Sequence, residues 1–445
     1  MNGKRRTLTL WDLLVYGIVL IQPIAPVPPY GFAQQLSNGH FATTMLVAMF
    51  AMMITAVSYG RMANVYPAAG SAYTYVGRGV NLHLGFLIGW AMFMDYLLQP
   101  LINTVFVAQI LIAQYVPQIP YIVWAAILSA LFTALNVLGI RSSARSNNVL
   151  LVAMFVAVLA FIVLALRYVV AAHGVGGAFS LAPFYDAKAF DWRRMWGATS
   201  FAALTYVGFD GITTLAEDAR DPKRTIMLAT VLACAFTGVF GGLQVYLASL
   251  VVPHWQAFTN LNNAFMEVSR IVGGALLFHA MSLIVTIAAF GSALTGGLGA
   301  AKLLFGMGRD GVLPRRLFGC LKAGTTTPVY NLVLVGVLTF IGAVLLNLYG
   351  NAYENAAFIL NFGALLAFMG VNFACFWHFR GQGNPIANAA VPLAGFVFCA
   401  AMWLGLAPAA KWVGGIWLLI GAIYLGLVTS GFRMPPATID FSSET

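Results

Sequence analysis

Long apolar stretches, separated by short groups of charges, glycines and prolines, occupy almost the whole chain. Each stretch has about 20 residues or more, which is the length that a helix needs to cross the hydrocarbon core of a bilayer. Alternating segments of about ten residues, which would indicate a membrane β-barrel, do not occur. The pattern therefore predicts about twelve membrane-spanning helices, near 11–35, 41–65, 83–113, 119–139, 148–171, 194–217, 225–252, 275–306, 328–349, 354–379, 388–409 and 412–432.

The composition leads to the same class of protein. Of the 445 residues, 61% are hydrophobic and only 8% are charged, and the mean hydropathy is +0.86. Soluble domains carry about 25% charged residues, and a soluble core cannot absorb this much apolar surface. We therefore expect an all-α membrane protein.

The first apolar segment cannot form one continuous helix. It contains Pro23, Pro26, Pro28 and Pro29 in the run QPIAPVPPYGF, and each proline removes a backbone donor and clashes with the preceding turn. Broken backbone at membrane depth is tolerated only where it is buried in protein or lines a cavity. The break therefore predicts a substrate path, and with it a transporter.

A second break is expected in the sixth segment. Secondary transporters often consist of two inverted halves with broken helices in corresponding positions. The corresponding run here is TYVGFDGITT, in which Gly208 and Gly211 flank Phe209 and Asp210. Glycine is also common in intact membrane helices, so the cluster has an ordinary interpretation as well. Breaks at both places would expose carbonyl groups that attract cations and N–H groups that attract carboxylates.

The distribution of lysine and arginine predicts the orientation. With the N-terminus inside, most of the 23 basic residues fall in inner segments, which is the usual positive-inside bias. Both termini are then cytoplasmic, and the net charge of +10 has anionic lipid rather than nucleic acid as its partner. No cleavable signal peptide is recognised, so the first segment should remain a helix. The basic residues expected on the outer side are Arg167, Lys188, Arg193, Arg194, Arg270 and Lys411.

Four long motifs resemble one known family. They are YPAAGSAYTYVGRGVNLHLGFLIGW at 66–90, FAALTYVGFDGITTLAED at 201–218, DPKRTI at 221–226 and KLLFGMGRDGVLPRRLF at 302–318. Over segments 1–10 the chain is similar to the amino acid–polyamine–organocation permeases. Within that family it looks most like the bacterial putrescine importers, on MDYLLQPLIN, GFDGITTLAED and LNFGALLAF.

The resemblance implies a LeuT-like fold of five plus five inverted repeats and transport by alternating access. It implies import of a small amino-containing solute into a bacterium across the inner membrane, coupled to protons or to exchange, without a cofactor. The expected division is a cytoplasmic segment 1–10, repeats at 11–172 and 190–380, two further helices at 386–433 and a cytoplasmic tail at 434–445.

Two neighbouring residues in the third segment are candidates for the site. A charge at the depth of Asp95 costs on the order of 3 kcal/mol on insertion scales, so it needs a partner or a function. It could be a counter-charge for a cationic substrate, a proton site, or an internal hydrogen-bond anchor. Tyr96 matches the substrate-recognising tyrosine of the putrescine importers, and its ring could hold an ammonium group. The alternative is a packed core tyrosine.

The other candidates lie at or near the breaks. Asp210 is the strongest single candidate for amine binding or proton exchange, because it places a carboxylate beside freed carbonyl groups. Gly208 shares its break, and Phe209 and Tyr206 would line a cavity or simply pack. In the first break we expect Gln22, Ile24 and Ala25 to contact substrate.

Proton coupling has few possible carriers. Some proton-coupled relatives place a lysine in the fifth segment, where this chain has only apolar residues around Met154. Asp95, Asp210 or Glu217 would then carry the proton, or the protein is an exchanger. Glu217 could instead form a cytoplasmic gate with nearby basic residues, or a hydrated ion pair of little energetic value.

The prolines also bear on the substrate. Amino acid permeases of this family use free N–H groups in the first break to bind a carboxylate, and Pro26, Pro28 and Pro29 delete three such donors. Val27, Tyr30 and Gly31 keep theirs. A diamine such as putrescine has no carboxylate, so the missing donors would not weaken its binding. An amino acid permease or exchanger of the same fold remains the alternative. A channel filter, an enzyme motif or a metal-binding spacing of histidines and cysteines is not found.

Overall fold

The computed structural model describes residues 8–67, 71–139, 144–216, 218–309, 311–321 and 327–436. This part of the chain is helical, and its only β pairing is an isolated bridge between Leu8 and Ala219. The apolar stretches have therefore formed helices, which satisfy all of their backbone groups internally.

Nine helices of the described residues are long and apolar enough to cross a membrane. Two shorter apolar helices are α1 (Leu10–Ile21) and α6 (Tyr121–Val137). Every segment expected from the sequence contains a helix. The nine long helices are α3 (Phe41–Val65), α5 (Leu82–Gln114), α7 (Ala144–Gly177), α9 (Pro222–Val251), α10 (Ala264–Arg309), α12 (Val329–Tyr349), α13 (Ala352–Phe379), α14 (Val391–Leu404, long enough only together with the π-helical turn that precedes it from Ile386) and α15 (Pro408–Val428).

The remaining elements are short. They are the helices α2 (Tyr30–Leu36), α4 (Ser71–Gly79), α8 (Trp192–Ala202) and α11 (Arg315–Phe318), with the 3₁₀ turns η1 (Ala203–Tyr206), η2 (Phe209–Leu215), η3 (Trp255–Ala257) and η4 (Leu261–Asn263), and a π-helical turn, η5 (Ile386–Ala390).

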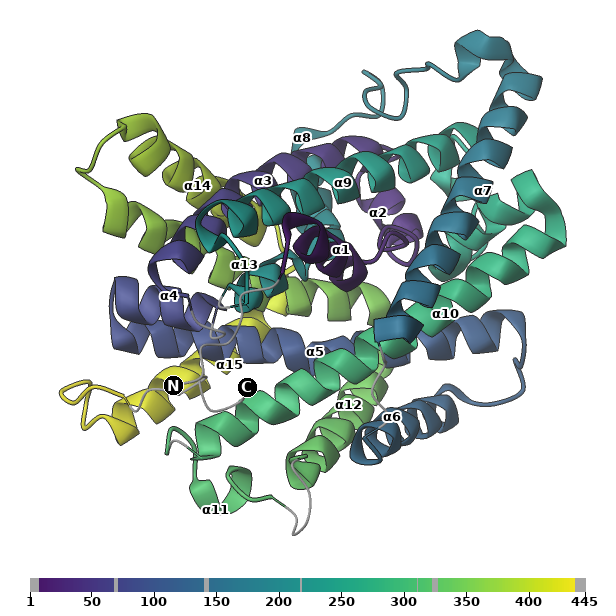
Figure 1. Ribbon diagram of the computed structural model, residues 1–445. Helices are drawn as coiled ribbons and strands as arrows, with labels where there is room; N and C mark the ends of the chain where they lie inside the picture. The colour runs from purple at the N-terminus through teal and green to yellow at the C-terminus, as the bar shows by residue number, and fades with distance from the viewer. Residues whose placement is uncertain are drawn as a thin grey trace.

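The long helices divide into an inner and an outer group. Helices α13, α3 and α5 are 78%, 61% and 56% buried over their most apolar windows, whereas α14 and α15 are only 22% and 17% buried. Figure 1 shows α14 and α12 at opposite edges of the bundle, with α13 and α5 between them. The inner helices can therefore carry polar side chains, and the outer ones present apolar side chains to lipid.

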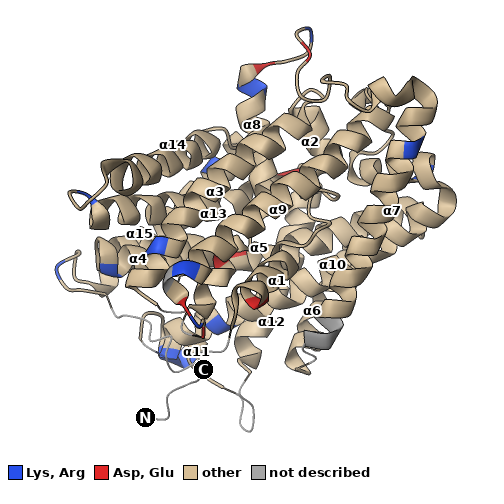
Figure 2. Ribbon diagram, turned by 45° about the horizontal axis from the view of Figure 1, so that its top comes forward, with Lys and Arg blue, Asp and Glu red and all other residues tan. Residues whose placement is uncertain are grey.

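Basic side chains gather at one end of the bundle. Figure 2 shows most lysines and arginines near α4, α11 and the two chain termini, with a few near α7 and α8 at the far end. At that far end Arg194 forms an ion pair with Asp191, at 4.0 Å. The lysines and arginines of the described residues are therefore unevenly divided between the two ends of the bundle.

The first apolar segment contains two helices separated by irregular backbone. Helix α1 begins with a capping box between Thr9 and Asp12 and ends at Ile21. Gln22 then adopts a positive φ of 69°, and turns lead through the prolines to α2, which begins at Tyr30.

The sixth segment is irregular at the matching place. Helix α8 tightens into η1, Gly208 has a φ of 112°, and η2 follows. A left-handed residue of this kind is easily accommodated only by glycine.

Helix α1, which leads into the first irregular stretch, lies against η2 through glycines. An added Cβ at Gly17 of α1 would lie 2.3 Å from Cδ1 of Ile212, and one at Gly211 of η2 would lie 2.6 Å from Cδ1 of Leu20. Close approach of backbones at small residues is the usual way in which membrane helices gain packing contacts. The breaks therefore meet in the interior of the bundle.

We predict that Gly31→Ala destabilises the protein although alanine is the better helix former. The new Cβ would lie 2.1 Å from the backbone oxygen of Leu261, and backbone cannot move aside as a flexible side chain can. The expected cost is about 1–3 kcal/mol, seen as a lower unfolding temperature of the purified protein. Gly415→Ala is the matched control, because nothing lies within 4 Å of its added Cβ. An unfolding temperature that is equal for both variants would contradict this packing.

Candidate functional site

A cavity of about 450 Å³ lies where the irregular segments meet α5, α7, α10 and α13. This volume lies within the range of about 300–1,000 Å³ that small-molecule sites occupy. Its wall combines apolar side chains with a few carboxyl, amide and hydroxyl groups, which is the usual composition of a selective site.

Most of the residues expected at the site line this cavity. They are Gln22, Ile24, Ala25, Asp95, Tyr96, Gly208 and Asp210. Residues far apart in the sequence, from the stretch after α1, from α5 and from the start of η2, are therefore brought to one chamber.

Two expected residues face elsewhere. The Tyr206 hydroxyl donates to the Met45 carbonyl at 2.8 Å, and the Phe209 ring packs against Tyr59 and Phe368 at centroid distances of 5.5 and 5.1 Å. Both side chains are fully buried, so they hold η1 and η2 against α3 and α13 and do not line the cavity. Glu217 lies outside the described residues.

Helix α5 places Asp95 and Tyr96 in the wall. One carboxylate oxygen of Asp95, Oδ1, is buried and has no hydrogen-bond partner in the described protein. Room for the Tyr96 ring comes from Gly299 of α10, whose added Cβ would lie 3.1 Å from Cδ1 of the ring. A buried oxygen without a partner is costly, so Asp95 is suited to accept a donor from outside the protein.

The second break fixes Asp210 at the start of η2. Its carboxylate lies beside the backbone amides of Gly208, Asp210 itself and Gly211, and the Thr213 hydroxyl donates to its backbone carbonyl at 2.7 Å. Asp210 is also within electrostatic range of Asp95 and Tyr96. The two acids therefore share one electrostatic environment.

No lysine, arginine or histidine lines this cavity within the described part of the chain. Two carboxyl groups without a cationic side chain make the chamber electronegative, and walls of low dielectric concentrate that field. In the described residues no group of three or more potential metal ligands occurs either. The described wall of the chamber thus carries acidic side chains and no basic ones.

The first break keeps most of its backbone groups occupied. The Ala25 and Val27 amides donate to the Gln22 and Ile24 carbonyls, both at 3.0 Å, and the Tyr30 amide donates to the Val27 carbonyl at 3.4 Å. The Gln22 side chain donates to the Ala288 carbonyl at 3.2 Å and ties the break to α10. The amides of Val27 and Tyr30, which the sequence left available, are thus engaged in turns.

Sequence reasoning missed two polar residues of the wall. Gln99 and Asn103 line the cavity together with Ser292 of α10. The available signal was their spacing from Asp95, because residues four apart lie on one face of a helix.

The two ends of the cavity differ. At one end Tyr16 is 37% exposed and Thr295 is also exposed. At the other end Phe106 and Tyr353 are buried, with ring centroids 5.6 Å apart, and Phe32 stacks on Tyr353 at 6.0 Å. The aromatic residues close their end of the chamber.

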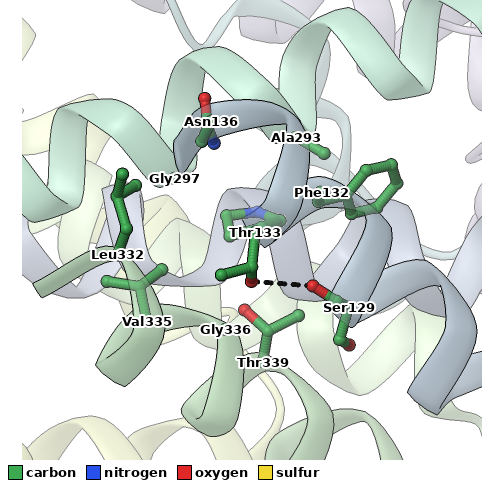
Figure 3. A pocket seen from close by; sticks show the side chains of 11 residues that line it. Ser129, Phe132, Thr133, Asn136, Ala293, Gly297, Leu332, Val335, Gly336 and Thr339 are labelled. Atoms are coloured by element: carbon green, nitrogen blue, oxygen red, sulfur yellow. Dashed lines mark hydrogen bonds between the residues drawn. The ribbon is translucent and has the colours of Figure 1, made fainter. Parts of the chain in front are cut away.

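A second hollow, between α6, α10 and α12 beside Pro100, has a volume of only about 10 Å³. Figure 3 shows the Thr133 hydroxyl donating within α6 to the Ser129 carbonyl, at 2.8 Å, where α12 approaches. Such a volume is about the least that can hold one water molecule, so this hollow is too small for a solute.

Comparisons with known proteins give matches along most of the chain. The family model described as Amino acid permease matches residues 31–429. The chain is 32% identical over 438 residues to the low-affinity putrescine importer PlaP of Escherichia coli, covering 97% of this chain and 95% of that protein. It is 27% identical over 461 residues to the branched-chain amino acid permease BcaP of Lactococcus lactis, covering 94% of each.

A solved structure shows the same fold. A manganese transporter of Eremococcus coleocola superposes with a TM-score of 0.57 at 11% identity, covering 97% of this chain and 98% of that one. At this identity the likeness concerns the fold alone.

We predict that the two ends of the cavity differ in access to thiol reagents. In a Cys320→Ser background, which removes the exposed cysteine, Thr295→Cys should react with a water-soluble maleimide at least about tenfold faster than Ile102→Cys, because access limits thiol reactivity. The background protein controls for the buried native cysteines. Equal rates at both positions would show that the aromatic end is not closed.

Proposed function

The chain belongs to the amino acid permease family, and from that premise we propose that it is a secondary transporter importing a small amine, most simply putrescine or a related polyamine. The observation that carries this proposal is the chamber between the two helix breaks. Its described wall holds Asp95 and Asp210 and no basic side chain.

The wall matches the chemistry of a diamine. Each ammonium group of a diamine needs a carboxylate or several neutral acceptors when it leaves water. Asp95 offers a buried oxygen without a partner, and Asp210 supplies a second carboxyl group in the same chamber. Tyr96 adds an aromatic face, which attracts a cation by about 0.5–2 kcal/mol.

The first break supports an amine over an amino acid. A substrate carboxylate would need free backbone amides, and three of the possible donors are prolines. The Val27 and Tyr30 amides donate within the turns, so an incoming carboxylate would compete with existing hydrogen bonds. A diamine makes no such demand.

An amino acid permease or exchanger is the second candidate, and one observation favours it. Part of the cavity wall is apolar, with Ile24, Ile102, Phe106, Val285 and Leu360. Such a surface would suit an aliphatic side chain, as the similarity to the branched-chain permease suggests.

The proposed transport cycle rests on the family architecture. We place twelve spans in a bacterial inner membrane with both termini cytoplasmic, as two inverted repeats at 11–172 and 190–380 with two helices at 386–433. Alternating access would open the aromatic end of the chamber and close the other. Asp95 or Asp210 would exchange the coupled proton, with Glu217 as a further candidate.

Uptake into proteoliposomes tests the substrate and the coupling together. Labelled putrescine should accumulate saturably, faster under an inward proton gradient, and unlabelled putrescine should compete far better than leucine or alanine. If the neutral amino acids compete better than putrescine, the second candidate is the correct one. Accumulation that is independent of the proton gradient but requires substrate inside the proteoliposomes would identify an exchanger.

The two acids should be separately required. Asp95→Asn and Asp210→Asn should each lower kcat/KM for putrescine by about thirtyfold or more, since losing one member of a buried charge pair typically costs at least about 2 kcal/mol. Glu267→Gln is the control, because Glu267 bonds Thr259 at an exposed position outside the cavity. Near-normal uptake by both aspartate variants would remove the basis of the proposal.

A further inference from the structure

Gln99 and Asn103 of α5 and Ser292 of α10 join the two helices by hydrogen bonds beside Asp95. Asp95, Gln99 and Asn103 follow one another at intervals of four residues, so they lie along one face of α5. Ser292 of α10 faces them. Its approach is possible because α10 carries glycines here: an added Cβ at Gly296 would lie 2.3 Å from Cβ of Gln99.

The hydrogen bonds among these side chains run from donor to acceptor in one order, from Asn103 through Ser292 to Gln99. The Asn103 amide donates to the Ser292 hydroxyl at 3.1 Å, and that hydroxyl donates to the Gln99 side-chain oxygen at 2.9 Å. A serine hydroxyl has one proton, so once it donates to Gln99 it can only accept from Asn103. The Asn103 amide is further fixed by donating to the Gln99 backbone carbonyl at 2.8 Å.

This direction determines what Gln99 can offer Asp95. The Gln99 oxygen is occupied by Ser292, so the free end of its side chain is the NH₂ group, which only donates. Gln99 lies beside the Asp95 carboxyl group. A donor there favours the ionised, accepting form of the acid, against the burial that favours the neutral form. The other carboxylate oxygen, Oδ1, keeps no protein partner.

We propose that Asn103, Ser292 and Gln99 form a positioning relay that favours the accepting form of Asp95 and leaves its Oδ1 free for the substrate ammonium group. The relay makes these three residues determinants of amine affinity, acting through Asp95. The inference rests on the proposed amine transport for its substrate, but the state of Asp95 can be measured without any substrate.

Ser292→Ala interrupts the relay at its centre. The Gln99 amide is then free to turn its oxygen toward Asp95, which favours the protonated acid. We expect the KM for putrescine to rise about tenfold, which is the usual effect of losing a hydrogen bond to a charged group, with less change in kcat. Ser292→Thr keeps the hydroxyl and should restore most of the affinity.

A matched control exists in the same pair of helices. The Ser282 hydroxyl of α10 donates to the Gln114 side chain of α5 at 3.0 Å, outside the cavity. Ser282→Ala therefore removes one α5–α10 hydrogen bond without touching the relay, and should leave the KM unchanged. An equal rise in KM for Ser282→Ala and Ser292→Ala would show that the loss of affinity comes from weaker packing of α5 against α10 and not from the relay.

Infrared titration separates the relay from the transported substrate. The carboxylic acid band that disappears in Asp95→Asn should appear at higher pH in Ser292→Ala than in the unmodified protein. The other titratable groups of the described wall are Asp210, Tyr16, Tyr96 and Tyr353, and they are the same in both proteins. A band at the same pH in both would overturn the relay, whereas a shifted band in a protein that does not transport putrescine would overturn only the proposed substrate.

Discussion

The lipid interior offers no water to a backbone polar group, and this constraint organises the whole structure. Helices meet it over most of the chain. Where prolines and Gly208 interrupt them, the freed groups must find partners inside the protein. Several of them do so in short turns, and the Pro23 carbonyl accepts from the Gln244 side chain. The Gln22 side chain ties the same stretch to α10 by donating to the Ala288 carbonyl. Polar groups therefore concentrate at one depth, and the cavity lies there.

Hydrophobic length was a good guide to the helices. The predicted limits of 41–65 are those of α3, and those of 83–113 differ from α5 by one residue at each end. The limits near 171 and 275 fell short of α7 and α10. Helix α7 continues past Gly174 and α10 extends across Gly274, both glycines with positive φ. A kink of this kind does not change the hydropathy pattern, so the sequence could not predict it. Helix α4 was missed because its nine residues are too few to give an apolar run.

The sequence located the acids of the chamber better than its aromatic residues. Asp95 and Asp210 could be singled out because charge at membrane depth is expensive in any packing arrangement. The orientations of Tyr206 and Phe209 depend on which neighbours fill space around η1 and η2, namely Met45, Tyr59 and Phe368. Partners so distant in the chain cannot be read from local pattern. Gln99 and Asn103 were overlooked for a related reason, because neutral amides are common and only their bonds to Ser292 distinguish them.

The interlocking of α1 with η2 has a mechanical consequence. Gly17 receives Ile212, and Gly211 receives Leu20, with no space for even a methyl group at either contact. Two surfaces fitted in this way cannot slide past one another without first separating, and separation would leave a void between them. Any displacement of α1 relative to the other helices would therefore carry η2 with it, so that two segments far apart in the chain move as one rigid unit.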